Sequence, residues 1–137
     1  MTTKLIIQIP CFNEEASLAI TLSALPKYIP QIDIIETCII DDGSNDRTVE
    51  VAKECGVNHI VRVPHNRGLA NAYMQGIDFC LKAGADIIVN TDADNQYRAD
   101  DIHKLVEPIL GNKADIVIGT RPISQIDRFS YLKKKLQ

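Results

Sequence analysis

The sequence lacks a long hydrophobic run and a surplus of positive charge. No stretch of about 18 apolar residues occurs, and the apolar run at residues 5–9 is too short for a signal-peptide core or a membrane span. The 15 Lys and Arg residues stand against 18 Asp and Glu residues, a net charge of −3, whereas nucleic-acid-binding proteins usually carry a basic surface. We therefore expect a soluble chain with no nucleic-acid partner. The basic run at residues 133–135 is interpreted as a solvated tail, with contact to anionic lipid as the alternative.

Cysteine pairs and two common nucleotide-binding motifs are also missing. None of the four cysteines belongs to a C-x-x-C pair or has a histidine at zinc-finger spacing. We therefore expect free thiols in a reducing compartment, which indicates a cytoplasmic location. The absence of G-x-x-x-x-G-K-[ST], and of G-x-G-x-x-G after the first expected strand, disfavours P-loop hydrolases and simple dinucleotide-binding proteins.

Strand-like and helix-like segments alternate along the chain. The pattern predicts strands at residues 4–9, 34–40, 59–63, 86–90 and 115–119. Helices are expected from a cap at Asn13 to Pro26, from a cap at Asp46 to Gly56, over 69–83 and over 100–110, with Pro108 ending or kinking the last. Repeated β-α-β units imply a mostly parallel sheet with helices on both faces, a Rossmann-like three-layer α/β/α fold.

Polar and acidic residues follow three of the expected strands. They are residues 13–15 after the first strand, 41–44 after the second and 92–96 after the fourth. Ligands of open α/β sheets bind beyond the carboxyl ends of the strands, so these residues are expected to share one edge of the sheet. Like charges gathered there repel one another unless a cation lies among them. A metal ion that bridges to a phosphorylated ligand is therefore expected.

The Asp92-Ala93-Asp94 segment is the strongest indication of that metal. An Asp-x-Asp at a strand end can offer oxygen ligands to Mg²⁺ or Mn²⁺, and Gln96 adds a carbonyl oxygen. The metal would stabilise a diphosphate leaving group. The alternative is a pair of turn-forming aspartates that cap the next helix. The position of the segment, after a buried strand and facing a second acidic turn, favours the metal.

The acidic turn after the second strand has two interpretations. Asp42 would accept a hydrogen bond from a ribose hydroxyl or a base N–H, and Gly43 would let the backbone approach the ligand closely. The alternative is a plain turn followed by a helix cap, the role that we assign to Asp46 and Thr48.

Three further segments have a binding interpretation, and two of them also have a structural one. Phe12 would pack on a base while Glu14 bonds to the N–H edge of that base; alternatively Phe12 is a core residue and Glu14 complements a helix dipole. Arg67 would reach a diphosphate, or it belongs to a surface loop. Arg121 would clamp phosphate or sugar oxygens.

These motifs, in this order, resemble the inverting glycosyltransferases of the GT-A fold, of the family 2 type. Within that family they are most similar to the polyprenyl- and dolichyl-phosphate sugar synthases. The segments that carry the resemblance are residues 9–15 (IPCFNEE), 40–44 (IDDGS), 66–69 (NRGL), 91–96 (TDADNQ) and 117–121 (VIGTR).

The resemblance implies a role for each matching residue. Pro10, Phe12, Glu14, Ile40 and Asp42 would surround the nucleoside of a nucleotide-diphosphate sugar. Asp92 and Ala93 would lie along the ribose and diphosphate, Asp94 and Gln96 would ligate Mg²⁺ or Mn²⁺, and Arg121 would contact the sugar nucleotide. No catalytic residue is identified in this chain.

Members of that family are much longer than 137 residues. The resemblance therefore implies that residues 1–122 form a nucleotide-sugar-binding domain without its acceptor half. The alternating pattern fades after Thr120, so residues 123–137 are expected to form a loosely held tail. The general base is expected in the remaining part, and the acceptor is expected to be a lipid phosphate at the cytoplasmic face of a membrane. The chain alone would bind nucleotide and metal with little or no sugar transfer, and its uncovered apolar surface favours a homo-oligomer.

Two alternatives assign the chain to a different functional class. A sugar-phosphate nucleotidyltransferase shares the sheet, nucleotide and metal, but it would carry a glycine-rich basic loop after the first strand, where this chain has Cys-Phe-Asn-Glu-Glu. A non-catalytic nucleotide-sugar-binding module is the other alternative for a chain of this length, although the intact Asp92 and Asp94 pair argues against decay of the site.

Overall fold

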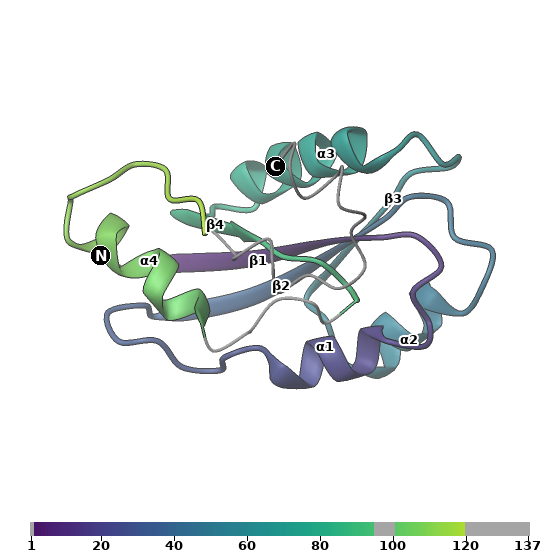
Figure 1. Cartoon of the computed structure of the whole chain (residues 1–137), viewed down its shortest axis with the longest axis horizontal. Coiled ribbons are helices and arrows are strands. Elements are labelled where there is room, and N and C mark those ends of the chain that lie inside the picture. Colours follow the sequence, from purple (N-terminus) through teal and green to yellow (C-terminus); the bar gives the residue numbers. More distant parts are fainter. Residues whose placement is uncertain (1, 95–100, 120–137) are drawn as a thin grey trace, which may run out of the picture.

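The computed structural model describes residues 2–94 and 101–119, in which strands and helices alternate. The four strands of this part form one parallel sheet in the order β3-β2-β1-β4 (Figure 1). No helix within these two ranges is both long enough and apolar enough to span a bilayer. The elements are β1 (Lys4–Cys11), α1 (Leu18–Ala24), β2 (Ile34–Asp41), α2 (Thr48–Glu54), β3 (His59–Arg62), α3 (Leu69–Lys82), β4 (Ile87–Asn90) and α4 (Ile102–Leu110).

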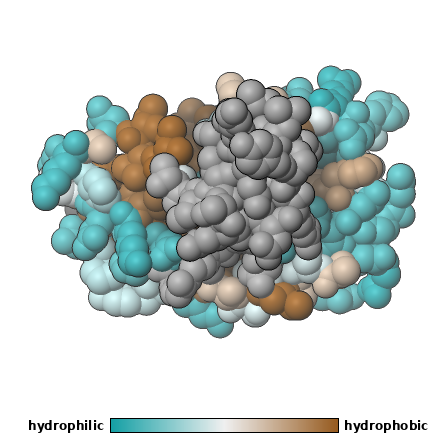
Figure 2. Space-filling view, in the orientation of Figure 1, coloured by the Kyte–Doolittle hydropathy of each residue, from teal (hydrophilic) through white to brown (hydrophobic). Residues whose placement is uncertain are grey.

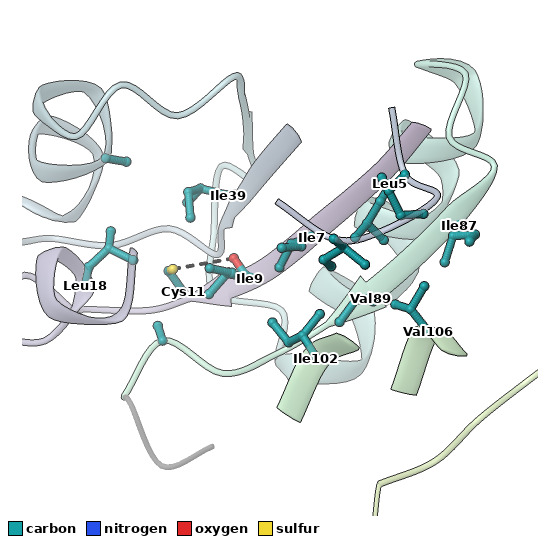
Figure 3. Close-up of a cluster of buried hydrophobic side chains, with 14 residues drawn as sticks. Leu5, Ile7, Ile9, Cys11, Leu18, Ile39, Ile87, Val89, Ile102 and Val106 are labelled. Atoms are coloured by element: carbon teal, nitrogen blue, oxygen red, sulfur yellow. Dashed lines mark hydrogen bonds between the residues drawn. The ribbon is translucent and has the colours of Figure 1, made fainter. Parts of the chain in front are cut away.

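Helices cover both faces of the sheet, which confirms the predicted three-layer α/β/α fold. The first core contains Leu5, Ile7 and Ile9 of β1 and packs against α1, α2 and α4 (Figure 3). The second core, on the opposite face, lies under α3 (Figure 1). It includes two of the three buried cysteines, Cys38 and Cys80, and all four cysteines are free thiols.

The central strand β1 is buried along almost its whole length because its neighbours and both helical layers enclose it. Its one uncharged polar residue, Gln8, is fully buried on the α3 side. The Gln8 Nε2 atom donates to Asn90 Oδ1 at 2.9 Å and to the Tyr73 carbonyl at 3.3 Å. A Cβ atom on Gly76 would lie 2.4 Å from Gln8 Oε1, so glycine permits α3 to approach β1 this closely.

The carboxyl ends of the strands meet at one edge of the sheet. Cys11 at the end of β1 lies opposite Asp41 at the end of β2, and the Asp42 amide donates to the Cys11 carbonyl at 2.9 Å. The Val63 amide donates to the Asp41 carbonyl, and the Thr91 amide to the Gln8 carbonyl, at 2.8 and 3.1 Å. The loops that follow the four strands therefore leave the sheet side by side.

The predicted fifth strand at residues 115–119 is wrong for this structure. The segment has no strand assignment and pairs with no strand of the described residues. Ile116 and Ile118 are 81% and 82% exposed, and hydrophobic surface is visible where this segment lies (Figure 2). An apolar run becomes a strand only where a neighbouring strand accepts its hydrogen bonds. Here the segment runs past α4 instead, with Gly119 close to Leu105.

The predicted start of the first helix and the predicted effect of Pro108 on the last helix also need correction. Asn13 does not cap α1, which begins at Leu18. Its backbone has a φ of 53°, and its Oδ1 atom accepts a hydrogen bond from the Asn45 amide at 2.8 Å, so it joins two loops. The last helix ends at Leu110 as predicted, but it continues through Pro108.

Candidate active site

A cavity of about 300 Å³ opens at the carboxyl edge of the sheet. Three strand ends and the start of α3 form its walls, as expected for a parallel α/β sheet. Seven of the residues predicted to bind the nucleotide sugar lie on these walls. The complete lining is Pro10, Cys11, Phe12, Glu14, Asp42, Asn66, Gly68, Leu69, Ala72, Asp92, Ala93 and Asp94.

Of the remaining predicted residues, Ile40 belongs to the described part of the chain and is absent from the cavity lining. Ile40 is fully buried in the core under α3, so its predicted contact with the nucleoside stays a prediction. Gln96 and Arg121 lie outside the described residues, as does the predicted tail at 123–137.

Several lining residues around the start of α3 had no individual role assigned from the sequence, although residues 66–69 belong to one of the segments that carry the family resemblance. Gly68 and Asn66 follow β3, so the carboxyl-end rule applied to the third strand would have found them. Leu69 and Ala72 lie within α3, and no local pattern distinguishes them from ordinary helix positions.

The loops after β1 and β2 are joined by several hydrogen bonds. The Asn13 amide donates to Ser44 Oγ, and the Glu14 amide donates to Thr48 Oγ1, each at 2.9 Å. Asp46 accepts hydrogen bonds from both the amide and the hydroxyl of Thr48, the first residue of α2. These bonds support a mainly structural role for Asp46 and Thr48, although the N-cap of α2 is Arg47 and not Asp46 as predicted. The network holds Phe12 and Glu14 beside the acidic turn.

The Asp42 carboxylate is buried and is bound to the loop that precedes α3. Its Oδ1 atom accepts from the Arg67 amide and its Oδ2 atom from the Gly68 amide, both at 2.9 Å. Gly43 packs against the same loop: with a φ of +80°, its added Cβ would lie 2.9 Å from the Asn66 amide nitrogen. This glycine therefore permits a close approach of the protein backbone, and its predicted approach to a ligand stays a prediction.

Three aspartates at this edge act on the Glu14 carboxyl. Burial raises the pKa of the Glu14 carboxyl; a hydrogen bond from Ser17 opposes this, and the charges of Asp94, Asp46 and Asp92 raise it further. Burial, together with the neighbouring carboxylates, also raises the pKa of the Cys11 thiol, so this thiol stays protonated and is not a nucleophile. The field in the cavity favours a bound cation.

The donors present suit a hard divalent cation. Among residues 2–94 and 101–119, no three His, Cys, Asp or Glu side chains form a group that could hold a metal ion by themselves. Asp92 and Asp94 nevertheless line the same cavity. Mg²⁺ is commonly held by one or two carboxylates together with substrate phosphates and water. These residues therefore fit a metal that arrives with a phosphorylated ligand.

Curated relatives of this chain include two sugar transferases that act on polyprenyl phosphates by name. One is the UDP-N-acetylglucosamine--dolichyl-phosphate N-acetylglucosaminyltransferase of Methanococcus voltae, 31% identical over 88% of this chain and 53% of the relative. The other is the undecaprenyl-phosphate mannosyltransferase of Micrococcus luteus, 32% identical over 84% of this chain and 47% of the relative. The chain thus spans about half the length of the curated relatives it matches.

The chain also matches a solved structure and a family model. The glucosyl-3-phosphoglycerate synthase of Mycobacterium tuberculosis, crystallised with Mn²⁺, UDP and glucosyl-3-phosphoglycerate, matches with a TM-score of 0.64 and 24% identity, over 79% of this chain and 40% of that chain. This similarity supports the GT-A fold. The family model described as glycosyl transferase family 2 matches residues 6–137, and the chain therefore belongs to glycosyl transferase family 2.

Proposed function

We propose that this chain binds a nucleotide-diphosphate sugar, with Mg²⁺ or Mn²⁺, for inverting transfer of the sugar to a polyprenyl phosphate. The observation that carries the proposal is the cavity at the carboxyl edge, where Phe12, Asp42 and the Asp92–Asp94 turn meet from three separate strand ends. An aromatic ring, hydrogen-bond acceptors and a pair of metal-binding carboxylates are the groups that a nucleoside diphosphate requires.

The nucleoside binds against the loops after β1 and β2. The Phe12 side chain is 39% exposed on the cavity wall, so one face of its ring is available to a base. Asp42 uses two of its roughly four acceptor positions for the loop before α3 and keeps the others for a ribose hydroxyl or a base N–H. Pro10 and Glu14, which also line the cavity, complete the surroundings of the nucleoside, and Ile40 pairs with Pro10 from within the core.

The diphosphate lies along the 92–94 turn. Asp92 and Ala93 contact the ribose and diphosphate, and Asp94 and Gln96 hold the metal. A metal held there would supply positive charge to stabilise the diphosphate as a leaving group. Arg121 contacts the sugar nucleotide. The names of the compared proteins support UDP as the first nucleotide to test, because two of them include a uridine nucleotide.

Transfer proceeds by a single displacement at the anomeric carbon. An oxygen of the acceptor phosphate bonds to this carbon from the face opposite the leaving group. The bond to the diphosphate oxygen breaks, its electron pair stays on the diphosphate, and the configuration inverts. A phosphate acceptor is already an anion, so the reaction needs little help from a general base. The names of the two polyprenyl-phosphate relatives support this acceptor class.

Calorimetric titration of the 137-residue chain with UDP and GDP tests the donor site. We expect one nucleotide to bind in the presence of Mn²⁺ and to be released by EDTA. Changes to outer partners of metal sites weaken binding 10- to 100-fold, so Asp94→Ala is expected to cost about a hundredfold or more. Asp78→Ala is the matched control, because Asp78 is an exposed carboxylate paired with Lys82. The proposal would be overturned if neither nucleotide bound, or if EDTA and Asp94→Ala both left nucleotide binding unchanged.

A further inference from the structure

One carbonyl in the Asp92–Asp94 turn accepts hydrogen bonds from two side chains near the start of α1. The Ala93 oxygen lies 2.9 Å from Ser17 Oγ and 2.8 Å from Thr21 Oγ1. Ser17 and Thr21 are four residues apart, one helical turn, so their hydroxyl groups face the same way. A carbonyl oxygen has two lone pairs, and the two hydroxyl groups can occupy both.

These contacts restrict the orientation of the turn. The peptide group that contains the Ala93 oxygen also contains the Asp94 nitrogen, so fixing this carbonyl fixes the point from which the Asp94 side chain departs. The Ala93 side chain is buried in the core shared by α1 and α4. Methyl packing and two hydrogen bonds therefore hold the turn from the core side, while Asp92 and Asp94 line the cavity.

The two hydroxyl groups differ in how firmly they hold the carbonyl. Ser17 Oγ also lies 3.1 Å from Glu14 Oε2, and because a hydroxyl has one proton, Ser17 can donate to only one of these acceptors at a time. Thr21 is only 4% exposed, so water competes little for its bond to Ala93. Removal of the Thr21 hydroxyl is therefore the sharper perturbation.

We propose that Ser17 and Thr21 are positioning residues, which hold the 92–94 turn in the geometry that presents its carboxylates to the metal and diphosphate. The effect of this positioning on metal and nucleotide binding rests on the proposed function. The competing interpretation is that the two hydroxyl groups only satisfy a buried carbonyl and stabilise the fold as a whole. Loss of a hydroxyl group should loosen the 92–94 turn alone if the residues position it, and the whole fold if they only stabilise the protein.

Three variants of α1 test the proposal. Thr21→Val removes the hydroxyl and keeps the shape of the side chain, whereas Thr21→Ser keeps the hydroxyl. Ser23→Ala is the matched control, because the exposed Ser23 hydroxyl donates only within its own helix, to the Ile20 carbonyl at 2.8 Å. Each variant is compared with the wild type by NMR-detected amide exchange of residues 91–94 without ligand, and by the Mn²⁺ concentration needed for half-maximal UDP binding.

We expect Thr21→Val to speed exchange at residues 91–94 selectively, relative to β1 and β2, and to raise the required Mn²⁺ concentration about tenfold. Thr21→Ser and Ser23→Ala should match the wild type in both measurements. Uniformly faster exchange throughout the sheet, or unchanged exchange in the 92–94 turn of Thr21→Val, would overturn the proposal. If the wild type binds no nucleotide, the proposed function fails, and the exchange measurement still decides whether these hydroxyl groups hold the turn.

Discussion

Replacement of Asp42 by Asn is expected to loosen the connection between the β2 turn and the start of α3. The buried carboxylate accepts one amide hydrogen bond on each oxygen, from Arg67 and Gly68, both at 2.9 Å. Asn keeps one acceptor and turns an NH₂ group toward the other amide. A hydrogen bond to a charged group contributes about 1.5–3 kcal/mol, so we expect the free energy of unfolding to fall by about 2 kcal/mol. For a domain of this size, that corresponds to a melting temperature about 6–8 °C lower.

Urea unfolding and thermal melting measure this loss, and NMR-detected exchange of the Arg67 and Gly68 amides localises it. Asp78→Asn serves as the control, since Asp78 is exposed and surface changes of this kind stay within about 0.5 kcal/mol. If Asp42→Asn left both the unfolding free energy and the two amides unchanged, the assignment of Asp42 to the scaffold would be refuted. Its predicted role would then be confined to the ligand.

Two further predictions concern the stability of the fold. A hydrogen bond from His59 holds the pKa of Glu36 below its ordinary value of 4.5, so the stability that Glu36 contributes is present above that value and is lost as the pH falls through the lowered pKa. The difference in unfolding free energy between wild type and Glu36→Gln should therefore shrink as the pH is lowered from neutral to below 4.5 in urea titrations; a difference independent of pH would contradict this. Gly76→Ala would place a Cβ atom 2.4 Å from the buried Gln8 Oε1. Overpacking should outweigh the better helix propensity of alanine, for a net loss of about 1–2 kcal/mol by urea unfolding. The exposed position Gln75→Ala on the same helix is its control, and equal stability of the two variants would show that α3 can shift away from β1.

Local sequence patterns determined most of the elements and the edge at which the site lies. The continuous apolar run of β1 and the helical spacing in α3 depend only on residues close in sequence, and the structure has both elements within two residues of the predicted ends. Parallel strands then bring Glu14, Asp42 and Asp94 to one edge, because every strand of such a sheet ends on the same side. The acidic cavity could therefore be placed from the sequence.

Only the tertiary structure decided what holds that site together. The bonds from Ser17 and Thr21 to Ala93 join residues more than 70 positions apart, and Asp42 bonds to a loop about 25 residues later. No local spacing encodes such partners. The segment at 115–119 is the converse case: its apolar pattern resembles a strand, but a strand forms only where a neighbouring edge supplies hydrogen bonds, and the fold of the described residues brings no such edge beside it.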